Sequence, residues 1–348
     1  MVEVWYGITS VMLAAYVVMD GFDLGAGALH WLVARTNEER RQTLAAIGPF
    51  WDGNEVWLLA SGGALFVAFP RVLAAGVSGF YFAIFLVLWT LILRGLAIEF
   101  RSHVNDPMWR AAWDFVFSLA STLLAVFFGA ALGNLIRGVP LDSKGWFSLP
   151  LFTDFSARNA VGILDWYTVL VGVFTLVGLA AHGAVFLAWK TDAAVGARSR
   201  NLARKLYAAV VALWLVASLA TAHINAAIFK ALPARPLAWL ATLVAVGGVV
   251  VVFVGLTHGA HLLAFVGSSC FLAGLLAATA ACFFPAMLRA TAGDSLSVTA
   301  YAAANDPHGL RTALDWWMVG FPLTVIYFVI NFRLHRGKAR AAAGGHGY

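Results

Sequence analysis

The stretch Met19-Asp-Gly-Phe-Asp-Leu-Gly-Ala-Gly27 places two acids, Asp20 and Asp23, inside an apolar run that extends from residue 4 to residue 33. The next apolar run is interrupted by Gly48-Pro-Phe-Trp-Asp-Gly-Asn-Glu-Val-Trp57, and the third by Arg94 and Glu99. A charge near the middle of a bilayer costs on the order of 3 kcal/mol, so such residues are usually paired or functional. This pattern predicts a polar, proton-handling interior within a bundle of membrane helices.

The composition supports the membrane assignment. Of the 348 residues, 61% are hydrophobic and 11% are charged, and the mean hydropathy of +0.83 lies outside the range of soluble proteins. Apolar stretches long enough to cross a hydrocarbon core of about 30 Å recur along the chain. They must be helices, because lipid offers the backbone no hydrogen bonds. We expect an all-α polytopic membrane protein with nine transmembrane helices, at 4–33, 49–69, 77–100, 111–136, 161–189, 204–229, 237–261, 265–288 and 316–334.

The loops divide these helices into groups. Helices 1–4 occupy residues 4–137, and after a polar loop helices 5–8 occupy 161–288. A second loop at 289–314 leads to helix 9 at 316–334. We therefore expect one integral-membrane domain over residues 1–336, followed by a flexible cytoplasmic tail at 337–348 that is rich in alanine and glycine.

The distribution of basic residues predicts the orientation. If the N-terminus lies outside, the loops at 35–41, 101–110 and 190–205 and the tail from Arg333 hold fourteen lysines and arginines, against eight in the opposite loops. Cytoplasmic loops carry the excess of such residues. The N-terminus is thus expected outside and the C-terminus in the cytoplasm. The same distribution explains the sequence pI of about 9.5 without nucleic acid as a partner.

With this orientation, all the charged residues inside the first three helices fall in the cytoplasmic half of the membrane. Asp20 and Asp23, and likewise Asp52 and Glu55, are three residues apart and share a helical face. A proton path is one interpretation. The other is structural: Arg94 neutralises one or two carboxylates, and Asp52 faces the positive end of a helix that begins near Pro49.

Histidines and tryptophans leave two further questions open. Imidazoles on several helices could hold a haem, and His182 and His258 share a level, but a packed and hydrogen-bonded histidine is the commoner case. Cys-x-x-Cys-His, metal-spaced Cys/His sets and phosphate-binding glycine loops do not occur in the sequence. Trp51 and Trp57 lie beside the acids, where they either line a tunnel or pack the bundle.

Several motifs resemble one family. The two acidic stretches quoted above, Arg94-Gly with Glu99-Phe-Arg, and Gly133-Asn-Leu-Ile-Arg-Gly-Val-Pro140 closely resemble the signature stretches of subunit II of cytochrome bd quinol oxidase. Tyr301-Ala-Ala-Ala-Asn-Asp-Pro307 is similar to the segment before the last helix of that family. The matches follow one another in order from the first helix to the last.

The resemblance implies a fold and a set of partners. Members of this family form two four-helix bundles plus one peripheral helix, and they pack against a subunit I that carries haems b and d, the quinol site and the site of O2 reduction to water. The chain itself is then expected to hold no cofactor, no metal and no catalytic centre. The complex would be electrogenic without pumping, in a bacterial cytoplasmic membrane with lipid and quinone, with a small single-helix subunit as a further candidate partner.

The resemblance also implies roles for individual residues. The family's proton entry falls near Asp52, its first-helix Asp on Asp23, and the arginine and acid of its third helix on Arg94 and Glu99. Together with Asp20, which the acidic pattern adds, we expect a proton path over Asp52, Asp23, Asp20 and Glu99, with Arg94 as the charge-pairing residue. Trp57, with Trp51, falls where the family has its oxygen tunnel. Glu55 occupies a position where the family has either Glu or Gln, which weakens a proton role for that residue.

Two other function classes remain open from the residues alone. A proton-coupled secondary transporter could also be built from two four-helix halves with buried acids. It would be expected to show broken helices around a site in the middle of the membrane. A b-type cytochrome in its own right is the other alternative, and it would depend on His182 and His258.

Overall fold

Aspartate–proline pairs start two of the long helices. In the computed structural model, which describes residues 1–156 and 161–339, the Asp106 carboxylate accepts a backbone N–H at the start of α7 (Pro107–Arg137). Asp306 does the same at the start of α14 (Pro307–Leu334). Such caps satisfy N–H groups that the first helical turn leaves unpaired, and proline at the first position has none to lose. Both helices therefore begin earlier than residues 111 and 316, where apolarity alone placed them.

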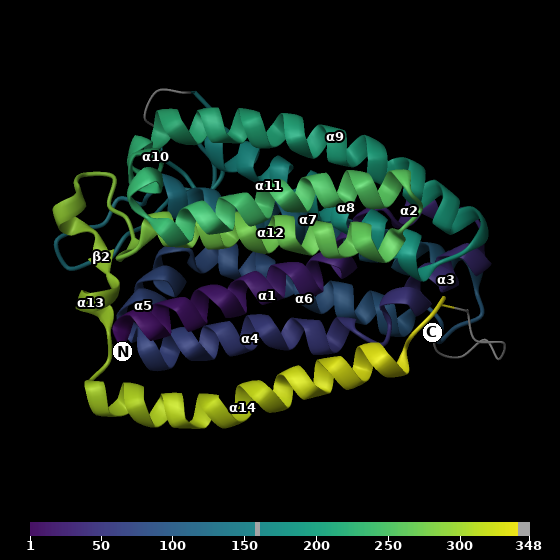
Figure 1. Cartoon of the computed structure of the whole chain (residues 1–348), viewed down its shortest axis with the longest axis horizontal. Helices are drawn as coiled ribbons and strands as arrows, with labels where there is room; N and C mark the ends of the chain where they lie inside the picture. The colour runs from purple at the N-terminus through teal and green to yellow at the C-terminus, as the bar shows by residue number, and fades with distance from the viewer. Residues whose placement is uncertain (157–160, 340–348) are drawn as a thin grey trace.

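The long helices run side by side along the longest axis of the molecule (Figure 1). The first group contains α1 (Val2–Ala28), α4 (Trp51–Ala68), α6 (Tyr81–Phe100) and α7, joined through the short helices α2 (His30–Val33), α3 (Asn37–Ile47) and α5 (Pro70–Gly79). The second group contains α8 (Trp166–Lys190), α9 (Ala193–Ile224), α11 (Pro236–Thr257) and α12 (His261–Phe283), with α10 (Ala226–Ala231) and a 3-10 turn at Leu232–Ala234 between α9 and α11. The last long helix, α14, lies at the edge of the bundle beside α4 (Figure 1).

The all-helical membrane fold is confirmed, but the count of nine spans is not. Within the described residues, eight helices are long and apolar enough to cross a membrane. The expected second span, α4, is not among them. Its first turns carry Asp52, Asn54 and Glu55, and these polar residues lower its hydropathy. The polar residues that suggested a functional interior are thus also the reason why α4 is less apolar than an ordinary membrane-spanning helix.

Several predicted boundaries were wrong. The run at 4–33 is broken at Leu29, between α1 and α2. Helix 6 of the prediction, at 204–229, starts much earlier, because the basic segment that we placed in a loop forms the first turns of α9. The loop expected at 289–314 contains a 3-10 turn at Asp294–Leu296 and α13 (Ala300–Ala303), and β2 (Val298–Thr299) pairs with β1 (Ala286–Leu288) as an antiparallel ribbon. The end of the expected tail, 340–348, lies outside the described residues.

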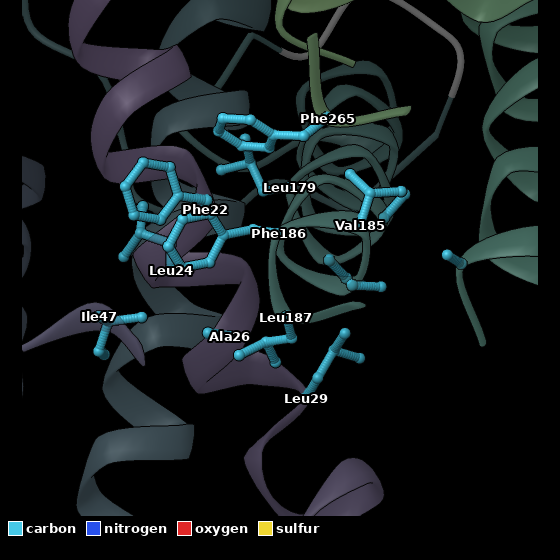
Figure 2. Packing of buried hydrophobic residues seen from close by; sticks show 14 of the residues in the cluster. Phe22, Leu24, Ala26, Leu29, Ile47, Leu179, Val185, Phe186, Leu187 and Phe265 are labelled. Carbon is cyan, nitrogen blue, oxygen red and sulfur yellow. The ribbon is translucent and has the colours of Figure 1, made fainter. Parts of the chain in front are cut away.

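Small residues let α1 and α8 cross in close contact. A Cβ added to Gly25 would lie 1.9 Å from the Leu179 carbonyl oxygen, and one added to Gly183 would lie 2.4 Å from the backbone of Gly25. Any larger residue at either position would force the helices apart. Next to this crossing the rings of Phe22 and Phe186 stack with centroids 4.0 Å apart, and Phe265 packs edge-on against Phe22 (Figure 2). This contact joins the two helix groups into one core.

The two ends of the molecule differ in what they carry. The N-terminus, α10, β2 and α13 lie at one end, whereas α2, α3 and the end of α14 lie at the other (Figure 1). The first and last long helices therefore start at the same end of the molecule.

We predict that the end with α2 and α3 faces the cytoplasm. In a background with Cys270→Ala and Cys282→Ala, the exposed positions Glu38→Cys and Asn201→Cys should resist an impermeant thiol reagent in intact cells. Ser143→Cys, exposed in the loop between α7 and α8, should react and serves as the control. The opposite labelling pattern would invert the topology.

Candidate functional site

A buried arginine brings together the acids of the first three long helices. Arg94 of α6 is fully buried and meets Asp20 of α1 with two nitrogens, at 3.0 Å (Nη1 to Oδ2) and 2.8 Å (Nη2 to Oδ1). Its Nη2 also lies 2.5 Å from an oxygen of Glu55 on α4, whose side chain is one quarter exposed. Hydrogen bonds between an arginine and a carboxylate are among the strongest polar contacts in proteins, and the second nitrogen adds an ion pair. One guanidinium therefore holds α1, α4 and α6 together inside the bundle.

Asp23 completes this group through an amide. The Asn54 side chain donates from Nδ2 to Asp23 at 2.7 Å and to the Met19 carbonyl at 3.0 Å. Asp23 is fully buried, and its second oxygen has no hydrogen-bond partner among the described residues. We call Asp20, Asp23, Asn54, Glu55 and Arg94 the Arg94 cluster. Asn54 had no predicted role, although an amide in a membrane helix beside an acid was a visible signal.

The structure separates the other two predicted acids from the cluster. Asp52 and Glu99 are both exposed, at the start of α4 and the end of α6. Asp52 lies one helical turn before Glu55, so their side chains are neighbours on α4. The prediction placed all these acids at one depth, but depth does not determine which way a helix turns its side chains.

The two tryptophans of α4 have different surroundings. Trp51 is half-buried and packs over α6, where a Cβ added to Gly95 would lie 3.4 Å from its ring. Trp57 is buried and stacks on Phe328 of α14, with ring centroids 5.6 Å apart. Trp51 thus packs against α6 at the residue that follows Arg94, whereas Trp57 reaches toward the peripheral helix.

Two apolar grooves flank α14. One, of about 780 Å³, lies between α4 and α14, and the other, of about 1560 Å³, lies among α1, α11, α12 and α14. Trp57 and Phe328 line both of them. The stacked pair therefore lies where the two grooves adjoin.

A second buried ionic group was missed by the sequence analysis. Asp114 of α7 is fully buried and accepts from His30 at 2.7 Å, Arg40 at 3.0 Å and Arg101 at 2.5 Å and 3.1 Å. Arg101 also donates to Asn37 at 3.0 Å. These contacts tie α2, α3, the end of α6 and α7 together. The signal in the sequence was an acid inside an apolar run, but its partners lie far away along the chain.

His182 and His258 do not fit axial haem ligation as a pair. His182 is fully buried, with Nε2 2.9 Å from the Val18 carbonyl oxygen and Nδ1 2.5 Å from the Ser268 hydroxyl. Since a carbonyl only accepts, Nε2 carries the proton and Nδ1 accepts from Ser268, which in turn accepts from Tyr207. Both ring nitrogens are thus engaged within the protein. His258 is exposed in the turn between α11 and α12, so it shares no buried site with His182.

Comparison with known proteins identifies the family to which this arrangement corresponds. A sequence profile of the family described as cytochrome bd terminal oxidase subunit II matches residues 1–335. The probable cytochrome oxidase subunit 2 of Haemophilus influenzae is 38% identical over 205 residues, covering 58% of this chain and 52% of that protein. The cytochrome bd-I ubiquinol oxidase subunit 2 of Escherichia coli K12 is 36% identical over 201 residues, with the same coverage of 58% and 52%.

A relative from Bacillus subtilis and a solved structure extend the comparison. The cytochrome bd ubiquinol oxidase subunit 2 of Bacillus subtilis is 33% identical over 225 residues, covering 64% of this chain and 62% of that protein. The alignments thus span between half and two thirds of the length of these curated relatives. A chain of the bd oxidase from Geobacillus thermodenitrificans superposes with a TM-score of 0.74 at 16% identity, over 96% of this chain and 98% of that one, which shows a shared fold.

We predict that Arg94→Ala strongly destabilises the fold. The substitution leaves Asp20 buried without its cation, and breaking a buried pair in this way costs about 3–5 kcal/mol. Thr90→Ala is the matched control, because Thr90 is also buried on α6 but its hydroxyl bonds only to carbonyls of its own helix. Arg94→Ala should lower both the amount of protein in membranes and its melting temperature in detergent far more than Thr90→Ala does. Equal losses would show that the Arg94 contacts contribute little.

Proposed function

Because the chain belongs to the family of cytochrome bd terminal oxidase subunit II, we propose that it is the second subunit of a quinol-oxidising bd complex in a bacterial cytoplasmic membrane. Haems b and d, the quinol site and the reduction of O2 to water belong to a partner subunit I in this proposal, which is supported by the engaged nitrogens of His182. The complex takes protons from the cytoplasm and is electrogenic without pumping. The family match favours this function over a secondary transporter.

The observation that carries the proposal is the Arg94 cluster with Asp52 beside it. Asp52 is exposed at the end of the molecule that we assign to the cytoplasm, and Glu55 follows one turn deeper on the same helix. Glu55 contacts Arg94, which contacts Asp20, and Asp23 lies one turn further along α1 from Asp20. Protons would enter at Asp52 and reach the buried carboxyls through Glu55. Arg94 would position these groups rather than carry protons.

The charge balance of the cluster supports a role in holding protons. Three carboxyls, those of Asp20, Asp23 and Glu55, share a single guanidinium. If all three were ionised, the buried cluster would carry an excess of negative charge, which a low-dielectric interior disfavours. Asp23 has an amide rather than a cation as its partner, so we assign the exchangeable proton to Asp23.

The exposed acids support a proposal for where subunit I packs. Asp52 and Glu99 lie on the outer surface of helices that also expose large apolar side chains, among them Leu59 of α4 and Trp89 of α6. A carboxylate that faces lipid is costly. We therefore place subunit I against the outer face of α4 and α6, where both acids would be shielded from lipid, and Glu99 would belong to the same proton route.

Oxygen access would use the grooves beside α14. O2 is apolar and partitions into apolar space, and the grooves lead from the lipid-facing surface to the stacked pair of Trp57 and Phe328. Trp57 lies on α4, the helix that also carries Asp52. One helix would then present the proton entry on one side and the wall of the gas path on the other.

We predict that Asp52→Asn slows turnover without loss of assembly. An amide matches the shape of the carboxyl but cannot release and take up a proton at neutral pH. Oxygen consumption with quinol should fall several-fold in membranes of the variant, while haem content stays near that of the wild type. Glu38→Gln, an exposed acid on the first turn of α3 at the same end, is the matched control. Full turnover in Asp52→Asn would mean that this acid is only a helix-end charge.

We predict that Gly63→Phe impairs oxygen access selectively. Gly63 lines the groove between α4 and α14, and no atom lies within 4 Å of a Cβ added there, so phenylalanine would fill the groove without a backbone clash. The kcat/KM for O2 should fall several-fold, with kcat at saturating O2 unchanged. Gly76→Phe on α5 has equally open surroundings but does not line this groove, and it should have no such effect. An unchanged kcat/KM for O2 would exclude this groove as the gas path.

A further inference from the structure

Basic side chains gather at the turn between α11 and α12. Arg204 of α9 donates to the Leu256 carbonyl at 2.9 Å, near the end of α11. Arg200, one turn earlier, donates to Nε2 of His261 at 3.3 Å, where α12 begins. Lys338 lies near enough to act electrostatically on the same imidazole. We call Arg200, Arg204, His261 and Lys338 the α9–α12 basic patch.

The positive charges of the two arginines of this patch are not balanced by a neighbouring carboxylate, whereas Lys338 lies 3.4 Å from Asp192. Among the described residues, no carboxylate lies within 4 Å of Arg200 or Arg204. The nearby acids are already engaged, because Glu39 pairs with Arg198 and Asp192 lies 3.4 Å from Lys338. Arg200, Arg204 and Lys338 are exposed. The start of α12 lacks a side-chain cap, and the positive end of its dipole adds to the potential at this point.

The patch lies where the polar part of the molecule meets its apolar belt. Beyond Lys205, α9 exposes Val211, Leu215 and Leu219 along its length. Directly after His261, α12 exposes Leu262 and Leu263. A molecule bound here would have its anionic part on the arginines and an apolar surface immediately below. This is the order of groups in a membrane phospholipid, from headgroup to acyl chains.

We propose that the α9–α12 basic patch binds an anionic phospholipid, with the headgroup phosphate on Arg200 and Arg204 and the acyl chains against α9 and α12. Each arginine near a headgroup contributes roughly 1 kcal/mol to the attraction of anionic lipid, which is about fivefold in affinity. A zwitterionic lipid offers the same acyl chains without the net charge. The patch should therefore select by headgroup, and the site is independent of the oxidase activity proposed above.

The test counts lipids on the intact assembly. The chain is extracted together with the subunits that accompany it, and bound lipid is removed. The assembly is then titrated with phosphatidylglycerol or phosphatidylcholine in mixed micelles, and native mass spectrometry measures the bound lipid. We expect a tight phosphatidylglycerol site that phosphatidylcholine fills poorly. Arg200→Gln with Arg204→Gln should weaken it about 25-fold, taken as fivefold per arginine. Arg200→Lys with Arg204→Lys should keep the preference, which controls for correct folding.

Two further arms complete the test. Lys230→Gln, an exposed cation on α10 at the opposite end of the molecule, should leave phosphatidylglycerol binding unchanged. Inorganic phosphate should not displace the bound lipid at equal concentration, because it lacks the acyl chains. Equal binding of both lipids, an unaffected glutamine variant, or displacement by inorganic phosphate would each overturn the proposal. None of these measurements depends on turnover.

Discussion

The two-pronged contact between Arg94 and Asp20 is the interaction on which the rest of the first helix group depends. It lies in a part of the molecule where water cannot replace a lost partner, so each charge is tolerated only because the other is present. The additional contact with Glu55 extends this dependence to α4. α4 is the least apolar of the expected spans. Its position beside α1 is therefore explained by polar contacts with α1 and α6 as much as by the preference of its apolar side chains for lipid.

Fixing α4 in this way also determines the surroundings of the proposed site. With Glu55 turned toward Arg94, Asp52 is left on the outer surface, and Trp57 points toward α14. The peripheral helix touches the bundle mainly along α4, which leaves apolar grooves on both of its sides. The contacts of Asp114 with Arg40 and Arg101 tie α3 and the end of α6 to α7. The functional proposals therefore rest on how one polar helix is oriented.

Much of this could be predicted from the sequence, because a charge in an apolar run is informative on its own. The depth shared by Asp20, Glu55 and Arg94 followed from helix direction, and the structure confirms that they meet. The rotation of α4 and α6 about their axes was not predictable, so Asp52 and Glu99 were grouped with buried residues although both are exposed. The contacts of Asp114 could not be predicted because its partners come from separate helices. The early starts of α7 and α14 were missed because a hydropathy profile does not detect a first helical turn that is polar and capped.

The central claim is that Arg94 and Asp20 are coupled, and a double-mutant cycle measures that coupling directly. Arg94→Met and Asp20→Leu are made singly and together, and the melting temperature of the detergent-extracted protein is recorded for each. Arg94→Met leaves the buried Asp20 carboxylate without its cation, and Asp20→Leu leaves Arg94 with only Glu55 of its two acids. The double variant removes both members of the pair and fills the space with apolar atoms. We expect the double variant to be more stable than Arg94→Met alone, with a coupling energy of about 0.5–3 kcal/mol. If the loss of stability in the double variant equals the sum of the losses in the two single variants, the account is contradicted.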